Sequence, residues 1–484
     1  MEKLKSGFAT LQKFSAFLLV GTVIALIWAN TDVHGYEHFI EGRLISPETL
    51  DAWEASGGLW ATLAHVYEWF AHILAHDPAT SAGIKQWAEE HQAADVPHPF
   101  SFHFVVNDLF MVLFFGIAAK EVSESFLPGG ALSSFQKAAM PAVATLGGVL
   151  GPVATFFILH AILAPEPAVT RAWAVPTATD IAYCWLFAQL IFGEKHPAVT
   201  FLLVLAVLDD LIGMMIIAVF YTEEVHLAWL GLVVAGVVWC EAMRRLRVTS
   251  FWPYVIVGGT LCWFGLHNTG VHAALALVPV VPFMPHAERD AGLFTSRRAD
   301  HEEAHSHDGH DDAHAHHEDT LNDFEHFFKP IVDVGLITFG IANAGVVISG
   351  QSLGGSPTWI IFCSLLFGKT IGIFLFALIG QRVMGLSLPK PMTMKQIIPL
   401  GAVAGIGFTV ALFVTTVALS SGEAATLEAF KASGTGDMLK LGALLSFAAG
   451  PIAFIISRVI NLERVNTSDE LKAAIANMEA ETAG

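Results

Sequence analysis

Three carboxylates interrupt sequence that is otherwise apolar enough to cross a lipid bilayer. Asp180, Asp209 and Asp210 lie within residues 174–210, where the surrounding segments are too long and too apolar for the core of a water-soluble protein. A charged side chain at the centre of a membrane helix costs roughly 2.5–3.5 kcal/mol on insertion scales. These carboxylates must therefore line a polar cavity, pair with a cation or carry protons.

Asp209 and Asp210 are the more informative pair because they are adjacent. Neighbouring carboxylates repel each other, so such a pair is suited to exchanging a proton. A site that can hold either a metal cation or protons is what cation/proton exchange requires.

The composition is typical of a polytopic, all-α membrane protein. Of the 484 residues, 54% are hydrophobic and only 14% are charged. The four cysteines fall in apolar runs without metal-binding spacing, so we expect buried thiols and no disulfide framework. Apolar runs of bilayer-spanning length predict about twelve transmembrane helices. They cover residues 13–30, 102–122, 138–164, 173–193, 197–220, 227–244, 251–267, 269–285, 328–350, 357–380, 396–419 and 439–461.

Two long polar insertions divide these spans. The predicted segments are an N-terminus with the first span (1–30), an extracytoplasmic insertion (31–101), a first membrane part (102–285), a His/Asp/Glu-rich cytoplasmic loop (286–327), a second membrane part (328–461) and a C-terminal tail (462–484).

Lys and Arg are distributed unevenly between alternate loops. Nineteen of the 25 lie at the N-terminus, in alternate loops or at the C-terminus, while five lie on the other side and Lys369 lies within a span. Because cytoplasmic loops are enriched in Lys and Arg, we predict that both termini are cytoplasmic.

The extracytoplasmic insertion contains an amphipathic stretch. Residues 59–75 mix Trp60, Tyr67 and Trp69 with Glu68 and two histidines. This pattern is typical of a helix that lies in the membrane interface, and a helix that caps the bundle fits it equally well.

The cytoplasmic loop contains a His-rich tract. Residues 301–319 hold seven His and seven acidic residues, a composition that cannot pack a core. Such tracts bind transition metals weakly or change charge when the histidines titrate. A solvated linker without a specific role is the third interpretation, and the composition favours it.

Two predicted spans contain helix-breaking residues near their centres. Pro176 removes a backbone donor shortly before Thr179 and Asp180, and residues 401–407 are rich in Gly. The breaks fall at corresponding places in spans 3–5 and 10–12, which predicts an inverted repeat with two broken, crossing helices. At the crossing, Asp180 would offset the positive N-terminal ends of the half-helices. Lys369 would offset their negative C-terminal ends. Taken alone, the glycine run is better explained by close helix packing.

Several motifs resemble the NhaA family of sodium/proton antiporters. The most specific are residues 173–182 (WAVPTATDIA) and 205–211 (LAVLDDL), and shorter matches follow in family order over nearly all of the predicted membrane domain. The shorter matches are residues 106–108, 270–273, 342–346, 368–369 with 371–373, and 404–409. The resemblance implies an electrogenic, pH-regulated, multi-pass transporter of the bacterial inner (plasma) membrane.

The resemblance also implies roles for individual residues. Asp209 and Asp210 match the pair that binds the cation and the protons, so Na+ would bind there. Lys369 matches the intramembrane lysine that pairs with the first of them and acts as proton carrier, although a purely structural counter-ion is the simpler alternative. The remaining matches are Thr179 and Asp180 at the broken-helix crossing, Asp108 as a further intramembrane acid, and Glu121, His272, Glu325 and His326 at positions linked to pH regulation.

Together these features predict a secondary active transporter, not an enzyme, that exchanges cytoplasmic Na+ or Li+ for external H+ in sodium and pH homeostasis. An exchanger of K+ or a divalent metal on the same fold is the alternative. We expect no cofactor and no nucleic-acid partner. A homodimer is left open, because residues 31–101 replace the short β-hairpin that the family uses for dimer contacts.

Overall fold

The computed structural model is helical throughout the residues that it describes. These are residues 16–42, 44–45, 47–65, 101–127, 130, 132, 135–163, 165–222, 226–286, 320–420, 433–462 and 464–483. The α-helices are α2 (Ala16–Thr31), α3 (Val33–Glu41), α4 (Pro47–Ser56), α7 (Phe102–Phe104), α8 (Met111–Ser125), α9 (Phe135–Leu163), α10 (Ile181–Phe192), α11 (Pro197–Phe220), α12 (Leu230–Arg245), α13 (Thr260–Thr269), α15 (Thr320–Asn343), α16 (Gly350–Gly354), α17 (Ser356–Cys363), α18 (Lys369–Arg382), α19 (Met394–Ala404), α20 (Phe408–Ser420), α22 (Thr435–Leu445), α23 (Ala449–Val459) and α24 (Ser468–Ala483).

Shorter segments of other helix types extend or join these helices. Three π-helical turns are η1 (Val105–Phe110), η4 (Tyr254–Gly259) and η7 (Ser364–Gly368). The 3-10 segments are η2 (Pro167–Thr177), η3 (Leu227–Trp229), η5 (Ala273–Leu275), η6 (Val281–Phe283) and η8 (Ser446–Ala448).

Many of these helices are apolar and long enough to cross a membrane. Within the described residues there are 6 such helices, or up to 8 if each of two bent helix pairs counts as one span. The six are Phe102–Ser125, Ala138–Leu163, Pro197–Phe220, Leu227–Arg245, Ser356–Arg382 and Thr435–Val459. They make the chain a multi-pass membrane protein, whereas the count of about twelve stays a prediction from the sequence.

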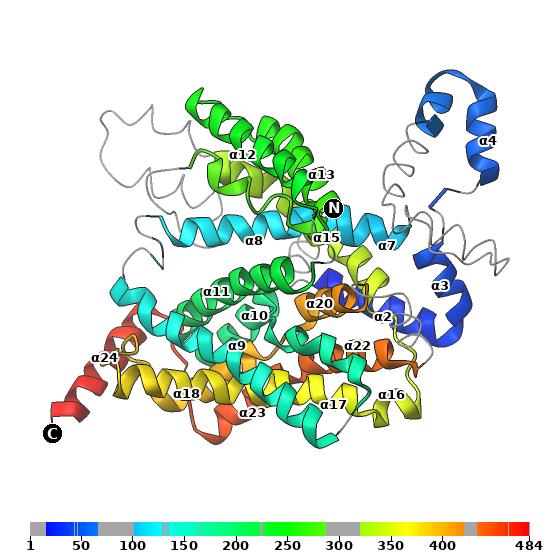
Figure 1. The fold of residues 1–484 in the computed structure, drawn as a ribbon. Coiled ribbons are helices and arrows are strands. Elements are labelled where there is room, and N and C mark those ends of the chain that lie inside the picture. Colours follow the sequence, from blue (N-terminus) through cyan, green and yellow to red (C-terminus); the bar gives the residue numbers. More distant parts are fainter. Residues whose placement is uncertain are drawn as a thin grey trace, which may run out of the picture.

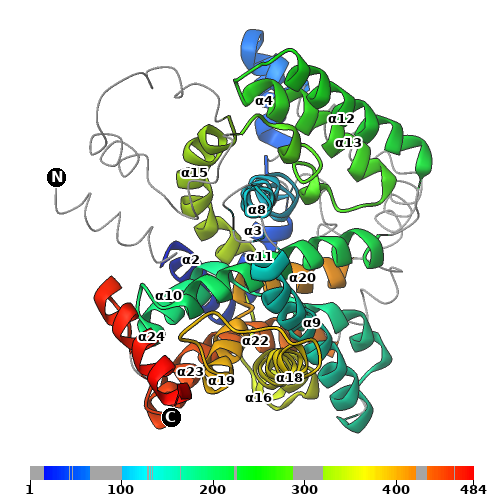
Figure 2. The same ribbon diagram turned by 90° about the vertical axis from the view of Figure 1, so that its left-hand side faces the viewer.

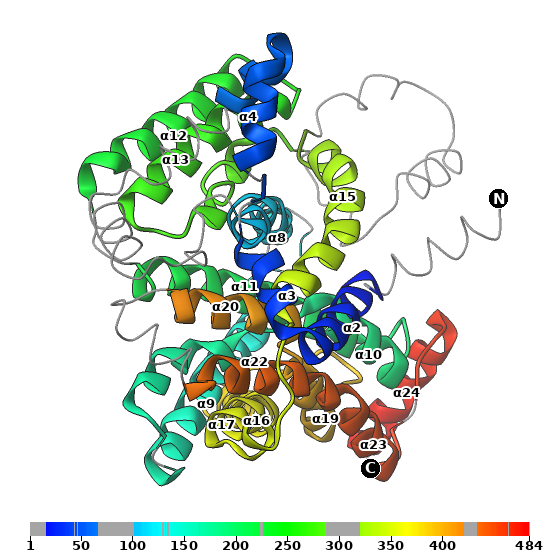
Figure 3. The same cartoon turned by 90° about the vertical axis from the view of Figure 1, so that its right-hand side faces the viewer.

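The helices form two groups that meet along α8, α11 and α20 (Figures 1 and 2). One group contains α2, α8, α12, α13 and α15, with α2 packed along α15 and α12 along α13. The other contains α9, α10, α11, α17, α18, α19, α20, α22 and α23, with α9 packed along α18. Figure 3 shows both groups from the opposite side, with α8 seen end-on between α11 and the α12–α13 pair.

The two breaks predicted inside spans are present. Segment η2 and helix α10 meet at an angle of 53°, and helices α19 and α20 meet at 51°. Pro176 and the Gly-rich residues 401–407 lie at or beside these breaks, as expected for residues that remove a helix donor or weaken a helix. The inverted repeat that they predict stays a prediction.

Two predicted spans are wrong in their extent. Residues 269–285 do not form one helix, because η5 and η6 are separate short turns and Pro279 and Pro282 cannot donate helix hydrogen bonds. The helix at the span predicted over 328–350 is α15, which ends at Asn343, so residues 344–349 are not helical. After it the backbone is held in a non-helical path by Asn30, whose amide accepts from the Ile348 N–H and donates to the Val346 carbonyl, both at 2.8 Å.

The insertions are described only in part. Residues 58–65, at the start of the predicted amphipathic stretch, are helical, and the Trp60 ring packs at a tilt against Trp53 of α4 with ring centroids 5.1 Å apart. Residues 66–75 and the His-rich tract 301–319 lie outside the described residues. All four cysteines are free, as the sequence predicted, and three of them are buried, whereas Cys363 is only half-buried.

Helices α9 and α18 cross so closely that only glycine fits at the contact. A Cβ atom at Gly372 would lie 2.1 Å from the backbone oxygen of Gly147, and one at Gly151 would lie 2.3 Å from that of Gly368. Small residues allow membrane helices to approach in this way. Lys369 follows Gly368 directly, so this crossing fixes the position of the Lys369 backbone.

We expect Gly372→Ala to destabilise the protein by about 1–3 kcal/mol, because its Cβ meets backbone atoms that cannot move aside cheaply. Gly231→Ala on α12 is the matched control, since a Cβ there meets nothing within 4 Å. The measurement is thermal unfolding of the detergent-purified proteins. Equal midpoints for the two variants would contradict the close crossing.

Candidate functional site

The two broken spans meet at their breaks. The backbone N–H of Asp180, at the start of α10, donates to the carbonyl of Ile406, between α19 and α20, at 2.7 Å. Each break exposes the end of one helix and the start of another. The crossing therefore brings together backbone donors and acceptors that need partners from side chains.

Asp180 supplies the partner for two helix N-termini. Its carboxylate accepts hydrogen bonds from the backbone N–H groups of Tyr183 in α10 at 3.4 Å and of Thr409 in α20 at 3.1 Å. The Thr409 hydroxyl also donates to it. A buried negative charge at two helix N-termini offsets their positive ends, as the sequence predicted for Asp180.

Lys369 supplies the opposite charge at the end of η2. Its ammonium donates to the carbonyls of Thr177 at 2.6 Å and Ala178 at 2.9 Å, and to Asp209 Oδ2 at 2.5 Å. The side chain is completely buried. The predicted pair between Lys369 and Asp209 is thus present, and the lysine also satisfies the exposed carbonyls of the broken helix.

The adjacent carboxylates on α11 are only partly satisfied. Asp209 Oδ2 accepts from Lys369 and, at 2.5 Å, from the hydroxyl of Thr179. The Oδ1 atoms of both Asp209 and Asp210 are buried and have no hydrogen-bond partner among the described residues. Buried carboxylate oxygens without a partner are costly unless a cation or a proton compensates them.

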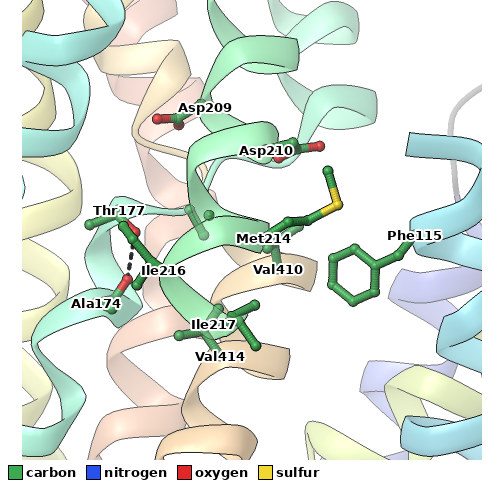
Figure 4. A pocket seen from close by; sticks show the side chains of 12 residues that line it. Phe115, Ala174, Thr177, Asp209, Asp210, Met214, Ile216, Ile217, Val410 and Val414 are labelled. Atoms are coloured by element: carbon green, nitrogen blue, oxygen red, sulfur yellow. Dashed lines mark hydrogen bonds between the residues drawn. The ribbon is translucent and has the colours of Figure 1, made fainter. Parts of the chain in front are cut away.

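A cavity beside these carboxylates lies between the two helix groups (Figure 4). Its water-accessible volume is only about 10 Å³, room for about one water molecule or one small dehydrated cation. Its polar lining comes from Asp209, Asp210 and Thr177, and the rest is apolar. The apolar lining residues are Phe115, Ala174, Ala178, Gly213, Met214, Ile216, Ile217, Val410 and Val414. The cavity can admit a small cation with little competition from other polar groups.

A second charged cluster joins the end of α8 to the start of α15. Lys120 bonds to Glu124 at 2.6 Å and to Glu325 at 2.5 Å, and Glu325 also bonds to Lys329 at 2.8 Å. Glu121 is buried beside this cluster and interacts electrostatically with its charges. The cluster therefore contains two of the four residues matched to pH regulation.

Glu325 precedes the span predicted at 328–350. Burial raises its pKa, but the ammonium groups of Lys329 and Lys120 lower it more, so that the pKa of Glu325 is about 2. A carboxylate with a lowered pKa stabilises the fold at neutral pH and loses that contribution only as the pH falls towards that value. Glu325 consequently stays ionised across the neutral range.

The other two residues matched to pH regulation lie apart from this cluster. His326 is exposed on α15. His272 lies 4.0 Å from the carboxylate of Asp108. It caps the start of η5 by accepting from the backbone N–H of Ala274 at 3.3 Å. Nine of the ten predicted site residues thus lie in three places: the broken-helix crossing with the α11 carboxylates, the charged cluster between α8 and α15, and the contact of His272 with Asp108. The tenth, His326, is exposed.

Sequence reasoning missed some residues that the structure brings to these places. Thr409 and Thr177 stood in the recognised motifs, but nothing in their spacing indicated that one would bind Asp180 and the other would line the cavity. Lys120 and Glu124 could have been found as charges at i, i+4 spacing near the end of a predicted span. No group of three or more His, Cys, Asp or Glu suited to a metal ion occurs in the described part of the chain.

Comparison with known proteins gives one consistent answer. The family model for Na+/H+ antiporter 1 matches residues 53–446. A relative named "Na(+)/H(+) antiporter NhaA" from Geobacter sulfurreducens is 42% identical over 94% of this chain and 98% of its own length. Relatives with the same name from Geotalea uraniireducens and Desulfitobacterium hafniense are 44% and 39% identical, over 94% and 96% of this chain and 97% and 99% of their own lengths. The chain therefore belongs to the Na+/H+ antiporter 1 family.

Proposed function

We propose that this protein exchanges Na+ or Li+ for H+ across the membrane, with Asp209 and Asp210 as the residues that bind the cation and the protons. The observation that carries the proposal is the pair of buried Oδ1 atoms without a partner, next to a carboxylate oxygen bound by Lys369. Hard cations prefer oxygen ligands, which these carboxylates offer. The family and the names of its relatives support the same exchange.

The exchange cycle follows from competition for one carboxylate. Without a cation, the ammonium of Lys369 compensates Asp209. A cation that enters the cavity takes over this role, so the lysine loses its partner and can release its proton. On the other side of the membrane a proton from that side re-protonates Lys369, the ion pair with Asp209 forms again, and the cation leaves to that side. Thr179 and Asp180 hold the crossing in place, with Thr179 bound directly to Asp209.

The orientation and the regulatory residues belong to the same proposal. The distribution of Lys and Arg supports cytoplasmic termini. The apolar runs support twelve spans, and the two breaks at corresponding places support an inverted repeat. The family supports a place in the bacterial inner membrane. Glu121, Glu325 and His326 would then lie towards the cytoplasm, and Asp108 and His272 towards the outside. Because Glu325 stays ionised at neutral pH, we assign the response to pH to Glu121, His272 and His326. Glu325 would provide only a fixed negative charge.

Proton flux in everted membrane vesicles tests the exchange. Addition of Na+ or Li+ to vesicles that have acidified their lumen is expected to release protons, whereas vesicles from cells without the protein are not. Proton release with K+ but not with Na+ or Li+ would contradict the proposed cation. A homodimer, which the exchange itself does not require, is tested separately by the mass of the purified protein in detergent.

Three roles of the His-rich tract 301–319 are open to test: a change of charge near the pKa of His, about 6.5, the rival role of weak transition-metal binding, and a linker without a role in transport, which the composition favours. Its seven histidines are mostly neutral at pH 8, where its seven acids make it strongly negative, and mostly cationic at pH 6. We expect deletion of residues 301–319 to shift the pH profile or the apparent cation affinity modestly, because salt screens charges beyond about 8–10 Å.

The measurement is vesicle exchange from pH 6 to 9, with and without a chelator or micromolar Zn2+. A variant in which Gln replaces the seven histidines keeps the acids and so separates metal binding from acidic charge. Superimposable profiles under all conditions would make the tract a linker without a role in transport.

A further inference from the structure

A buried polar network lies where α15 and α20 meet the start of the span that contains α8. Its three side chains are Asn107 in η1, Asn343 at the end of α15 and Thr416 in α20, and all three are buried. Asn343 Nδ2 donates to Asn107 Oδ1 at 3.0 Å, and Thr416 Oγ1 donates to Asn343 Oδ1 at 2.8 Å. The proposed binding of cations and protons uses none of these side chains.

The bond from Thr416 to Asn343 joins the two groups of helices. Asn107 and Asn343 belong to the group that contains α8 and α15, whereas Thr416 belongs to the group that carries the ion site. Asn343 Nδ2 also donates to the Phe339 carbonyl, and Asn107 Nδ2 donates to the His103 carbonyl, both at 3.2 Å and both within the first group. Separation of α20 from α15 therefore breaks the bond from Thr416 and leaves the other bonds of the network intact.

Thr416 has a substitute acceptor in its own helix. The Thr416 hydroxyl lies 3.1 Å from the carbonyl of Leu412, four residues earlier in α20. A hydroxyl has one hydrogen, so Thr416 can keep a hydrogen bond to Leu412 when it loses Asn343. Asn343 Oδ1 then loses its donor, and water that enters an opened interface can replace it. The bond can therefore break and form again at low cost, as a reversible contact requires.

The network lies beside the cavity at the ion site. Val414 of α20 lines the cavity from one group of helices, and Phe115 of α8 lines it from the other. Thr416 lies two residues beyond Val414, towards the end of α20 at Ser420, and α15 ends at Asn343 itself. The network therefore lies between the cavity and the end of the bundle where α15 and α20 finish. In the proposed orientation this end faces the outside.

We propose that the hydrogen bond from Thr416 to Asn343 is a latch that favours the state in which the cavity is closed to the outside. The inference rests on the proposed exchange, because exchange requires the ion site to reach both sides of the membrane in turn. Loss of one such bond changes the equilibrium between the closed and open states about two- to tenfold, from the typical net contribution of a hydrogen bond.

Thr416→Val tests the latch, because it keeps the shape of the side chain and removes the hydroxyl. The reporter is Val414→Cys in a chain whose four native cysteines are replaced by Ala. It is labelled with a membrane-impermeant thiol reagent in right-side-out and in everted vesicles. We expect Thr416→Val to raise the labelling rate from the external side about two- to tenfold, with a smaller change from the cytoplasmic side. Thr416→Ser keeps the hydroxyl and should restore the original rate.

Thr415→Val is the matched control for the loss of a buried hydroxyl. Thr415 is buried beside Thr416 and donates to the carbonyl of Ala411 in its own helix at 2.7 Å. We expect its external labelling to stay at the original rate. In a chain that carries Asn343→Ala, Thr416→Val should have no further effect, because the bond is already lost.

A second readout needs no cysteine reporter. The apparent KM for Na+ on the external side varies inversely with the fraction of molecules that are open to that side. In Thr416→Val this KM should therefore fall by the same factor by which labelling rises, and in Thr415→Val it should not change. The measurement is Na+-driven proton exchange in right-side-out vesicles.

Two outcomes would overturn the inference. One is an unchanged external labelling rate together with an unchanged external KM in Thr416→Val. The other is an equal change of both quantities in Thr415→Val. Failure of the exchange itself is distinguishable, because labelling reports access to the cavity without transport, and the unmodified protein would then release no protons on addition of Na+ or Li+.

Discussion

Asp210→Asn is expected to abolish cation-dependent proton exchange while the protein still accumulates in the membrane. The substitution keeps the size of the side chain but removes its negative charge, and the amide cannot take up and release the proton. Since Asp210 Oδ1 bonds to no described residue, the change costs little folding energy. Vesicle proton flux with Na+ and Li+ measures the exchange, and the amount of protein in the membrane measures folding.

Glu241→Gln is the control for removing a negative charge from a membrane helix. Glu241 lies on α12 and pairs with Arg244 at 2.7 Å and Arg245 at 2.7 Å, away from the cavity. The Glu241→Gln variant should keep a cation-dependent proton flux near that of the unmodified protein. Cation-dependent proton flux retained in Asp210→Asn would show that this carboxylate does not bind the transported ions.

Lys369→Ala is expected to be the most destabilising of the substitutions considered. It leaves the buried Asp209 carboxylate and the carbonyls of Thr177 and Ala178 without their donor. Removing one partner of a buried ion pair typically costs about 3–5 kcal/mol. Because Na+ can compensate Asp209 in place of the lysine, Na+ should raise the thermal midpoint of Lys369→Ala more than that of the unmodified protein.

The double variant Lys369→Ala/Asp209→Asn separates the charge from the loss of packing. It removes both members of the pair, so it should regain part of the stability lost in Lys369→Ala but lose the extra response to Na+. We also expect Lys369→Ala to change the pH profile, the apparent cation KM or the electrogenicity of exchange. If stability, pH profile, affinity and current were all unchanged, Lys369 would not be part of the cycle.

The sequence predicted the parts of the site that depend on charge in an apolar environment. A buried lysine needs an acid, so the Lys369–Asp209 pair could be inferred from the residue types and their apolar surroundings. Pro176 and the Gly-rich residues 401–407 likewise predicted where helices break, because their effects are local to the backbone.

Other parts depend on which surfaces meet, and the sequence could not show this. Whether Thr177 faces a cavity depends on the position of α11 relative to η2, and the partner of Asp180 depends on α20 arriving from a distant part of the chain. Hydropathy also treated residues 269–285 as one helix, since their apolar character is the same in a helix and in the short turns η5 and η6.

The Lys369–Asp209 pair also has a consequence for biogenesis. Its two members are 160 positions apart in the chain, and a chain is synthesised from its N-terminus. Helix α11 is therefore inserted with both carboxylates before Lys369, the partner of Asp209, has been synthesised. An interrupted chain that stops between α11 and α18 would keep uncompensated carboxylates in the bilayer, which should make it a preferred substrate for membrane proteases compared with one that stops after α18.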